Sequence, residues 1–273
     1  MLDTPWRRLA ATLFDAPHSA RILVRAVVNA EPVEAYLAEA GAGRSLGFLH
    51  FVAAAAARAI AEDAPELNGY LERGRVRARD GVTVSVTAPL PGEGGLLALP
   101  LAHADRRSVR GLAEALRESL LATRARYRRD GRLSEYVLAG VPWPVRRGVF
   151  RAARGLAGLG VPMGRFDLAP ESFGALVVTH MEPLWRGYPE GEGVFDSAFV
   201  PLFPAARNAS LLAVIPPQPL PAVVGGALTV QRRATLCFTF DHRLVDGLEV
   251  GRFVQGVGRR LLDPAALDRP LDP

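Results

Sequence analysis

The sequence predicts an α/β fold. Segments whose apolar and polar residues alternate, as in strands, interleave along the chain with segments whose apolar residues recur at helical spacing. With 49% hydrophobic and 22% charged residues, the composition is that of a globular protein. A chain of 273 residues is long enough to bury a sizeable core, as one large domain or two small ones.

The first predicted elements are a strand and two helices. Residues 20–30 alternate enough to predict a strand, and Pro32 begins a helical stretch. Residues 45–62 predict a long alanine-rich helix, which Ser45 is expected to cap. The segment DAPELN, residues 63–68, predicts a turn.

Strands then return, followed by a second long helix. Residues 75–89 carry strand signals that an Asp-Gly hairpin dipeptide interrupts at 80–81. The clearest alternation lies at 82–88, and residues 96–102 predict another strand. Residues 107–127 predict a helix with one leucine-rich side.

The C-terminal part is predicted to be rich in strands. Apolar runs typical of buried strands and of a strand pair lie at residues 175–181, 197–203, 210–215, 222–230 and 233–240. Residues 216–221 predict a proline-rich connection between two of these strands. The last element is a helix from about residue 246 to residue 262.

Several kinds of chemistry are excluded by missing residue types. The Lys+Arg total of 33 is arginine alone, which excludes Schiff-base chemistry on a lysine, a phosphate loop ending in Gly-Lys-Ser/Thr, and lysine-bound lipoate or biotin. The single cysteine, Cys237, excludes an intramolecular disulfide and an all-cysteine metal site. Since His18, His50 and His103 lack the carboxylate or cysteine spacing of metal ligands, we expect no metal site.

The sequence gives no sign of a membrane span or an export signal. The longest apolar run, residues 51–57, falls far below the ~20 residues that a spanning helix needs. Residues 1–20 lack a hydrophobic signal core of sufficient length. We therefore expect a cytoplasmic protein without a transmembrane segment.

Arginine is concentrated in one region. Residues 124–154 contain nine arginines against Asp130 and Glu135, a net charge of +7, whereas the whole chain carries +5. Within this region, residues 145–159 predict a short amphipathic helix. One interpretation is a solvated basic face on an insertion. The other is a patch for an anionic partner: coenzyme phosphates, an acidic carrier protein or a membrane surface. Nucleic acid is disfavoured, because few aromatic residues are interleaved with the arginines.

The most informative stretch is FTFDHRLVDG, residues 238–247, in which an apolar strand leads into charged residues and then the final helix. The polar and turn-forming positions are Asp241, His242, Arg243, Asp246 and Gly247. A histidine at a strand end is well placed to act as a general base, because imidazole has an unperturbed pKa of ~6.5. We expect Arg243 to pair with the flanking carboxylates and fix the loop, and Gly247 to allow a tight turn into the helix.

The motif belongs to a longer pattern. DHRLVDG, followed by a helix ending in LLDP, resembles the catalytic domain of dihydrolipoamide acyltransferases, the acyltransferase cores of 2-oxo acid dehydrogenase complexes. The signature of that family is Asp-His-Arg-x-x-Asp-Gly. Earlier segments resemble the family in the same order: APHSARILVRAVV (16–28), LHFVAAAAARAIAEDAPELNGYL (49–71) and LALPLAHADRRSVRGLAEALRE (97–118). The resemblance covers roughly residues 16–126 and 171–264.

The resemblance implies a fold and an assembly. The fold is that of chloramphenicol acetyltransferase, a two-layer sandwich with a mixed sheet and helices on one side. It would form a single catalytic domain over residues 1–273, with an Arg-rich insertion at about 127–170 and without lipoyl or subunit-binding domains. The family assembles as a homotrimer, with the active site in a channel between neighbouring subunits. Because the chain ends in LDPAALDRPLDP rather than in a hydrophobic anchor, a free trimer is expected over a larger cage.

The resemblance also implies a reaction, in which an acyl group passes between coenzyme A and a dihydrolipoyl-type thiol. His242 would be the general base that deprotonates the thiol, and Asp246 matches the second acidic position, which supports the catalytic loop. Arg243 would be structural. Coenzyme A is then a substrate, and a lipoyl group would come from another protein, such as a lipoyl carrier or a dehydrogenase complex.

The oxyanion donor is expected on another strand. The family uses a serine hydroxyl in a Thr-Ile-Ser-Asn-Leu-Gly-like strand, and aligning GALVVTHME, residues 174–182, puts Thr179 at that serine. Threonine keeps the hydroxyl, whereas the three positions that follow depart from the family pattern. The first of them, His180, is a candidate second polar group in the channel.

Two alternative functions stay open for this fold. The departures at 180–182 and the absence of a lipoyl domain are compatible with a catalytically idle trimeric scaffold. An acyltransferase with an amine or hydroxyl acceptor, as in antibiotic acetyltransferases and condensation domains, would carry a motif that begins His-His. Asp241 occupies that first position here and favours the dehydrogenase-complex branch.

Overall fold

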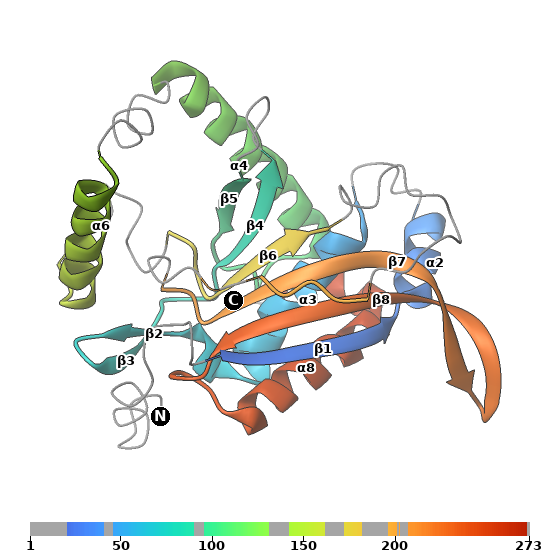
Figure 1. Ribbon diagram of the computed structural model, residues 1–273. Coiled ribbons are helices and arrows are strands. Elements are labelled where there is room, and N and C mark those ends of the chain that lie inside the picture. The colour runs from blue at the N-terminus through green and yellow to red at the C-terminus, as the bar shows by residue number, and fades with distance from the viewer. Residues whose placement is uncertain are drawn as a thin grey trace.

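A mixed six-stranded sheet forms the centre of the molecule, and helices cover one of its faces (Figure 1). The computed structural model describes residues 21–40, 46–89, 96–130, 142–161, 172–181, 196–200, 202 and 207–271. This is the predicted α/β class, with a mixed sheet and helices on one side.

The sheet has the strand order β1-β8-β7-β6-β4-β5. Its strands are β1 (Arg21–Asn29), β4 (Val84–Pro89), β5 (Leu96–Leu101), β6 (Leu176–His180), β7 (Ser210–Val224) and β8 (Ala227–Asp241). β6 runs parallel to both β4 and β7, and the other neighbouring pairs are antiparallel. Two short strands, β2 (Gly69–Glu72) and β3 (Arg75–Ala78), form a separate hairpin.

The main core lies between the sheet and the helices packed on it. The helices are α2 (Glu31–Glu39), α3 (Phe48–Glu62), α4 (Val109–Asp130), α8 (Gly247–Leu261) and the short α9 (Pro264–Leu267), with a 3-10 turn η1 (Pro65–Asn68). All ten residues from Phe51 to Ile60 of α3 are buried, and six of them are alanines, which lets this helix pack closely. On α8, Phe253 meets Phe238 and Phe240 of β8 edge-on, with ring centroids 5.6 and 5.8 Å apart.

One more helix, α6 (Trp143–Gly158), lies beside the β2–β3 hairpin and not against the large sheet (Figure 1). It confirms the amphipathic helix predicted at 145–159. The remaining predicted helices, at 45–62, 107–127 and 246–262, also form, with ends shifted by at most three residues. Within the described residues, no helix is long and apolar enough to cross a bilayer.

Three local predictions in the N-terminal half and at Gly247 were wrong. Helix α3 begins after Gly47, which takes the N-cap position assigned to Ser45, a residue outside the described part. The dipeptide at 80–81 does not close a hairpin, because β3 pairs with β2 while β4 joins the large sheet. Gly247 has no positive φ and starts α8 as any residue can, so the tight turn does not depend on it.

Three predictions around β7 were also wrong. Residues 196–200 and 202 cross the face opposite the helices without forming a strand. The prolines at 216–221 lie inside β7, after a bulge between Ile215 and Gln218. β6 ends opposite Val214, so beyond that point no described strand pairs with this edge of β7, and the edge tolerates proline. The predicted strand at 222–230 is instead a hairpin, with Gly225 and Gly226 at positive φ in its turn.

Candidate active site

The end of β8 and the start of α8 hold the DHRLVDG loop in a fixed conformation. The buried carboxylate of Asp241 accepts hydrogen bonds from the backbone N–H of Arg243 at 3.0 Å and from its Nε and Nη2 at 2.9 and 2.5 Å. Leu244 and Val245 anchor the loop in the core, at 3% and 0% exposure. The predicted ion pair of Arg243 is therefore confirmed, and its partner is Asp241.

His242 projects from this loop and is about one third exposed. Its Nδ1 lies 3.0 Å from the carbonyl oxygen of Val245, which can only accept a hydrogen bond. Nδ1 therefore carries the proton of the neutral ring, and Nε2 keeps its lone pair. A histidine held in this tautomer presents Nε2 as a proton acceptor.

Asp246 is the carboxylate that faces His242. Its Oδ1 lies 3.2 Å from His242 Nδ1, and both side chains are about one third exposed. Asp246 is also the N-cap residue of α8, and its backbone N–H donates to Glu249 Oε2 at 2.9 Å. The helix start thus fixes the position of a carboxylate beside the imidazole.

Thr179 lies near the end of β6, at 8% exposure. The hydroxyl of Thr87, on the neighbouring strand β4, donates to Thr179 Oγ1 at 2.9 Å. The Thr179 oxygen therefore accepts one hydrogen bond, and its own proton remains for donation to another group. Thr87 was missed from the sequence, although the alternation of 82–88 places it on the same face of β4 as Ser85.

A cavity of about 390 Å³ adjoins Thr179, between the ends of β4 and β6 and one side of α4. Apart from Thr87, Thr179 and His180, its lining is apolar: Leu49, Val86, Ala88, Pro89, Leu99, Leu116, Leu120 and Met181. His180, the predicted second polar group, thus lines the same cavity as Thr179. The leucines of α3 and α4 could not be assigned to a site from the sequence, because helical spacing marks them only as core residues.

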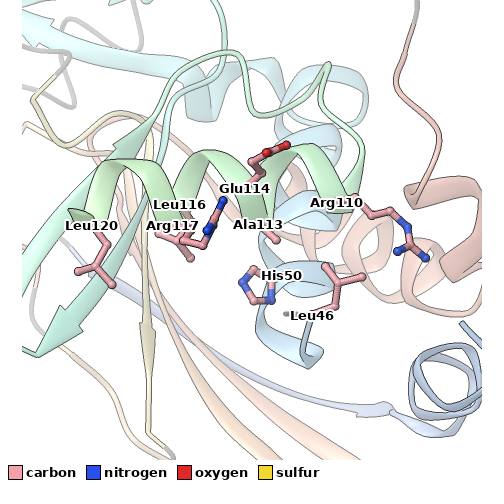
Figure 2. Close-up of a pocket in the computed structure, with 8 residues that line it drawn as sticks. All are labelled: Leu46, His50, Arg110, Ala113, Glu114, Leu116, Arg117 and Leu120. Carbon is pink, nitrogen blue, oxygen red and sulfur yellow. The ribbon is translucent and has the colours of Figure 1, made fainter. Parts of the chain in front are cut away.

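A second hollow, of about 560 Å³, continues from the first along α4 and shares Leu116 and Leu120 with it. Figure 2 shows His50 and Leu46 facing α4 across this hollow. Burial lowers the pKa of His50, a hydrogen bond with Gly47 opposes that shift, and the nearby His180 adds to it. Burial thus favours the neutral ring of His50, and its Nδ1 lies 3.0 Å from the backbone nitrogen of Gly47.

His242 and Thr179 do not meet within one chain. Thr179 is opposite Ala213 of β7, which is opposite Cys237 of β8, four residues before Asp241. Four residues span ~13 Å along a strand, and two strand spacings span ~10 Å at right angles to it. The backbones at Thr179 and Asp241 are therefore ~16 Å apart. The two predicted catalytic groups therefore lie toward opposite ends of the sheet.

The remaining site predictions concern metals. In the part of the chain that the structure describes, no three histidine, cysteine or carboxylate side chains gather in a way that would hold a metal ion. Cys237 is buried in the sheet, and the backbone N–H of Ala198 lies 3.4 Å from its Sγ.

Comparisons with known proteins identify the family that this chain resembles. Residues 195–268 match the family described as 2-oxoacid dehydrogenases acyltransferase (catalytic domain). A lipoamide acyltransferase component of the branched-chain alpha-keto acid dehydrogenase complex from Pseudomonas aeruginosa is 27% identical over 268 residues, which cover 96% of this chain. The chain spans about half, 51%, of the length of that relative.

Solved structures share the fold. The dihydrolipoamide acetyltransferase of Azotobacter vinelandii superposes with a TM-score of 0.60 at 18% identity, covering 96% of this chain and 87% of that one. A chloramphenicol acetyltransferase superposes with a TM-score of 0.52 at 14% identity, covering 93% and 94%. The predicted resemblance to the acyltransferase catalytic domain and the chloramphenicol acetyltransferase-like fold are both confirmed.

Proposed function

We propose that this chain is a coenzyme A-dependent acyltransferase that exchanges an acyl group between coenzyme A and a dihydrolipoyl-type thiol. The observation that carries the proposal is the contact of His242 Nδ1 with the Val245 carbonyl, which places the proton of the neutral ring on Nδ1 and makes Nε2 the basic nitrogen. The family match supports it, because residues 195–268 include β8, the catalytic loop and α8.

In the proposed reaction, His242 acts as general base and then as general acid. Nε2 takes the proton from the acceptor thiol, and the thiolate attacks the carbonyl carbon of the acyl-coenzyme A thioester. The Thr179 hydroxyl donates to the oxyanion of the tetrahedral intermediate. The intermediate then expels the coenzyme A thiolate, which takes the proton back from His242, so the enzyme returns to its starting state.

Asp246 would assist through its charge. When Nε2 takes the proton the ring becomes cationic, and a carboxylate 3.2 Å from Nδ1 stabilises that cation. In the A. vinelandii acetyltransferase, the catalytic roles of a serine, a histidine and an asparagine four positions after the histidine have been investigated. Asp246 stands at the same spacing from His242 and would take the position of that asparagine.

We propose that the complete site requires two copies of the chain, in a homotrimer. Thr179 and His242 lie too far apart within one chain to touch the same thioester, since the oxyanion donor and the base must both lie about 3 Å from reacting atoms. A channel between subunits, as the family resemblance implies, brings His242 of one subunit to Thr179 of the next.

The cavity beside Thr179 suggests the kind of acyl group. Its lining is mostly apolar and its volume of about 390 Å³ exceeds the needs of a methyl group. The P. aeruginosa relative belongs to a branched-chain complex. We therefore propose branched-chain acyl groups as donors, with dihydrolipoamide, free or carried by another protein, as acceptor, since this chain has no lysine to carry lipoate.

The test measures acyl transfer from acetyl-, succinyl-, isobutyryl- and isovaleryl-coenzyme A to free dihydrolipoamide. The readout is the amount of acylated dihydrolipoamide that forms. His242→Ala should lower turnover by about 10²–10⁴-fold, and Thr179→Val by about 10²–10³-fold. Thr179→Ser keeps the hydroxyl and should retain most of the rate. His103→Asn is the matched control, since His103 is a surface histidine at φ 49°, which asparagine tolerates.

Each result separates the proposed function from its alternatives. Turnover that survives His242→Ala would remove His242 as the base. A folded oligomer that transfers no acyl group to dihydrolipoamide, but does so to an amine or hydroxyl, would replace the acceptor. No transfer to any acceptor would favour the idle scaffold.

A further inference from the structure

Helix α6 is attached to the molecule at one end and leaves most of its surface exposed. The carbonyl oxygens of Gly158 and Leu159 accept hydrogen bonds from Arg73, from its backbone N–H and its Nε, each at 2.7 Å. Near this end Ala157 is buried, at 4% exposure. Figure 1 shows the helix standing beside the β2–β3 hairpin, away from the six-stranded sheet.

One side of α6 is an exposed apolar stripe. Val145, Val149 and Leu156 are 56%, 51% and 45% exposed, and their spacing of four and seven residues places them on one side of the helix. Ala157, which faces the molecule, follows Leu156 by one residue and so lies ~100° around the helix from it. None of the described residues buries this stripe.

Arginine occupies the opposite side. Positions 147, 151 and 154 are separated by four and three residues, so they share one side of the helix, and Arg151 is exposed. By the helical repeat, these positions lie ~120–180° around the helix from the stripe. Residues 136–166 contain five arginines and no aspartate or glutamate. The arginines at 147, 151 and 154 therefore lie away from the exposed apolar stripe, and no acidic residue within 136–166 neutralises them.

We propose that α6 binds the surface of a membrane that contains anionic phospholipids, lying parallel to the bilayer with its apolar stripe among the acyl-chain ends. The negative potential of such a surface attracts the arginines, and the apolar layer beneath its headgroups can bury the stripe. A second copy of α6 would cover the stripe but bring two cationic helices together. The 16-residue length spans ~24 Å, enough for four turns in contact with the interface.

The test is sedimentation of the full-length protein with vesicles of phosphatidylcholine alone or mixed with phosphatidylglycerol at 7:3. Binding is expected only to the anionic vesicles, and it should weaken with salt. The triple variant Arg147→Gln, Arg151→Gln, Arg154→Gln should lose about 100-fold in affinity, several-fold for each arginine near the surface. The double variant Val149→Gln, Leu156→Gln should lose about tenfold or more at unchanged charge.

A matched control removes three charges elsewhere, through Arg75→Gln, Arg106→Gln and Arg107→Gln, all at exposed positions. The proposal requires this variant to bind anionic vesicles nearly as well as the parent. Equal loss in the control would mean that net charge alone drives binding. Undiminished binding of the Val149→Gln, Leu156→Gln variant would mean that the stripe stays out of the lipid. Failure of the parent to bind at low salt would leave an acidic protein as the partner. Any of these three results overturns the proposal. The thermal unfolding midpoint and the acyl-transfer activity of each variant show whether that variant folds.

Discussion

The separation of His242 from Thr179 gives a quantitative test of the two-subunit site. The strand register places Thr179 level with Cys237, two strands away, and Cys237 precedes Asp241 by four residues. The backbones at Thr179 and Asp241 are therefore ~16 Å apart. A thioester carbon with its oxyanion cannot contact both groups across that span. One variant should therefore complement the other when they assemble together.

The perturbation is co-assembly of His242→Ala with Thr179→Val in equal amounts, from purified variants that are unfolded together and refolded. Each variant alone retains at most about 1% of parental turnover. In a randomly mixed cyclic oligomer, each boundary between subunits needs an intact His242 from one subunit and an intact Thr179 from its neighbour. Each is present in about one half of the chains, so about one quarter of the boundaries are complete. The mixture should therefore recover about 25% of the parental rate per chain.

The assay is acyl transfer to dihydrolipoamide, with the oligomer size measured on the same sample. The control mixes the parent with a chain that carries both substitutions. That mixture should give about one quarter of the rate if the site lies between chains, and about one half if it lies within one. A mixed oligomer with no more activity than its separate components would refute the two-subunit site.

Three further predictions follow from individual contacts. Thr87→Val removes the hydrogen bond that orients the neighbouring threonine hydroxyl, so kcat should fall about 3–10-fold with little change in KM, and an unchanged kcat would remove its positioning role. Burial raises the pKa of the Cys237 thiol, so a thiol reagent should not label the native protein but should label one thiol per chain in denaturant. Burial raises the pKa of Asp268, but hydrogen bonds from Tyr36 and Arg110 outweigh it and leave that pKa lowered. The stability that Asp268 contributes is then present above its unfolded pKa and lost at lower pH. Asp268→Asn should unfold at lower urea concentration at pH 7, and the difference should shrink below about pH 4.

The sequence predicted the elements whose periodicity agrees with their environment. β1 alternates, and α4 and α8 carry apolar residues at helical spacing, because each buries one side against the core. β7 was not recognised as one strand, because its prolines lie beyond the point where β6 stops pairing with it and the sheet becomes narrower. That width is a property of the tertiary structure, and no local signal in residues 216–221 reports it.

The site was predictable in part. His242, Asp246 and the Asp241–Arg243 pair lie within six consecutive residues, so one motif contains the base, the carboxylate beside it and the ion pair of the loop. Thr87 and the leucines around the cavity come from β4, α3 and α4, and only the fold brings them to Thr179. A single sequence gives no signal that distinguishes such residues from ordinary core positions.

The two halves of the proposed site are fixed independently of each other. The loop around His242 is held by an ion pair, two buried side chains and the N-terminus of α8, all within its own chain. Thr179 is held by its place in β6 and by Thr87. Since neither half needs the other to reach its conformation, association of folded subunits is sufficient to assemble the proposed site. Catalysis would then depend on the accuracy of subunit docking, because a displacement of about 1 Å between base and oxyanion donor is costly.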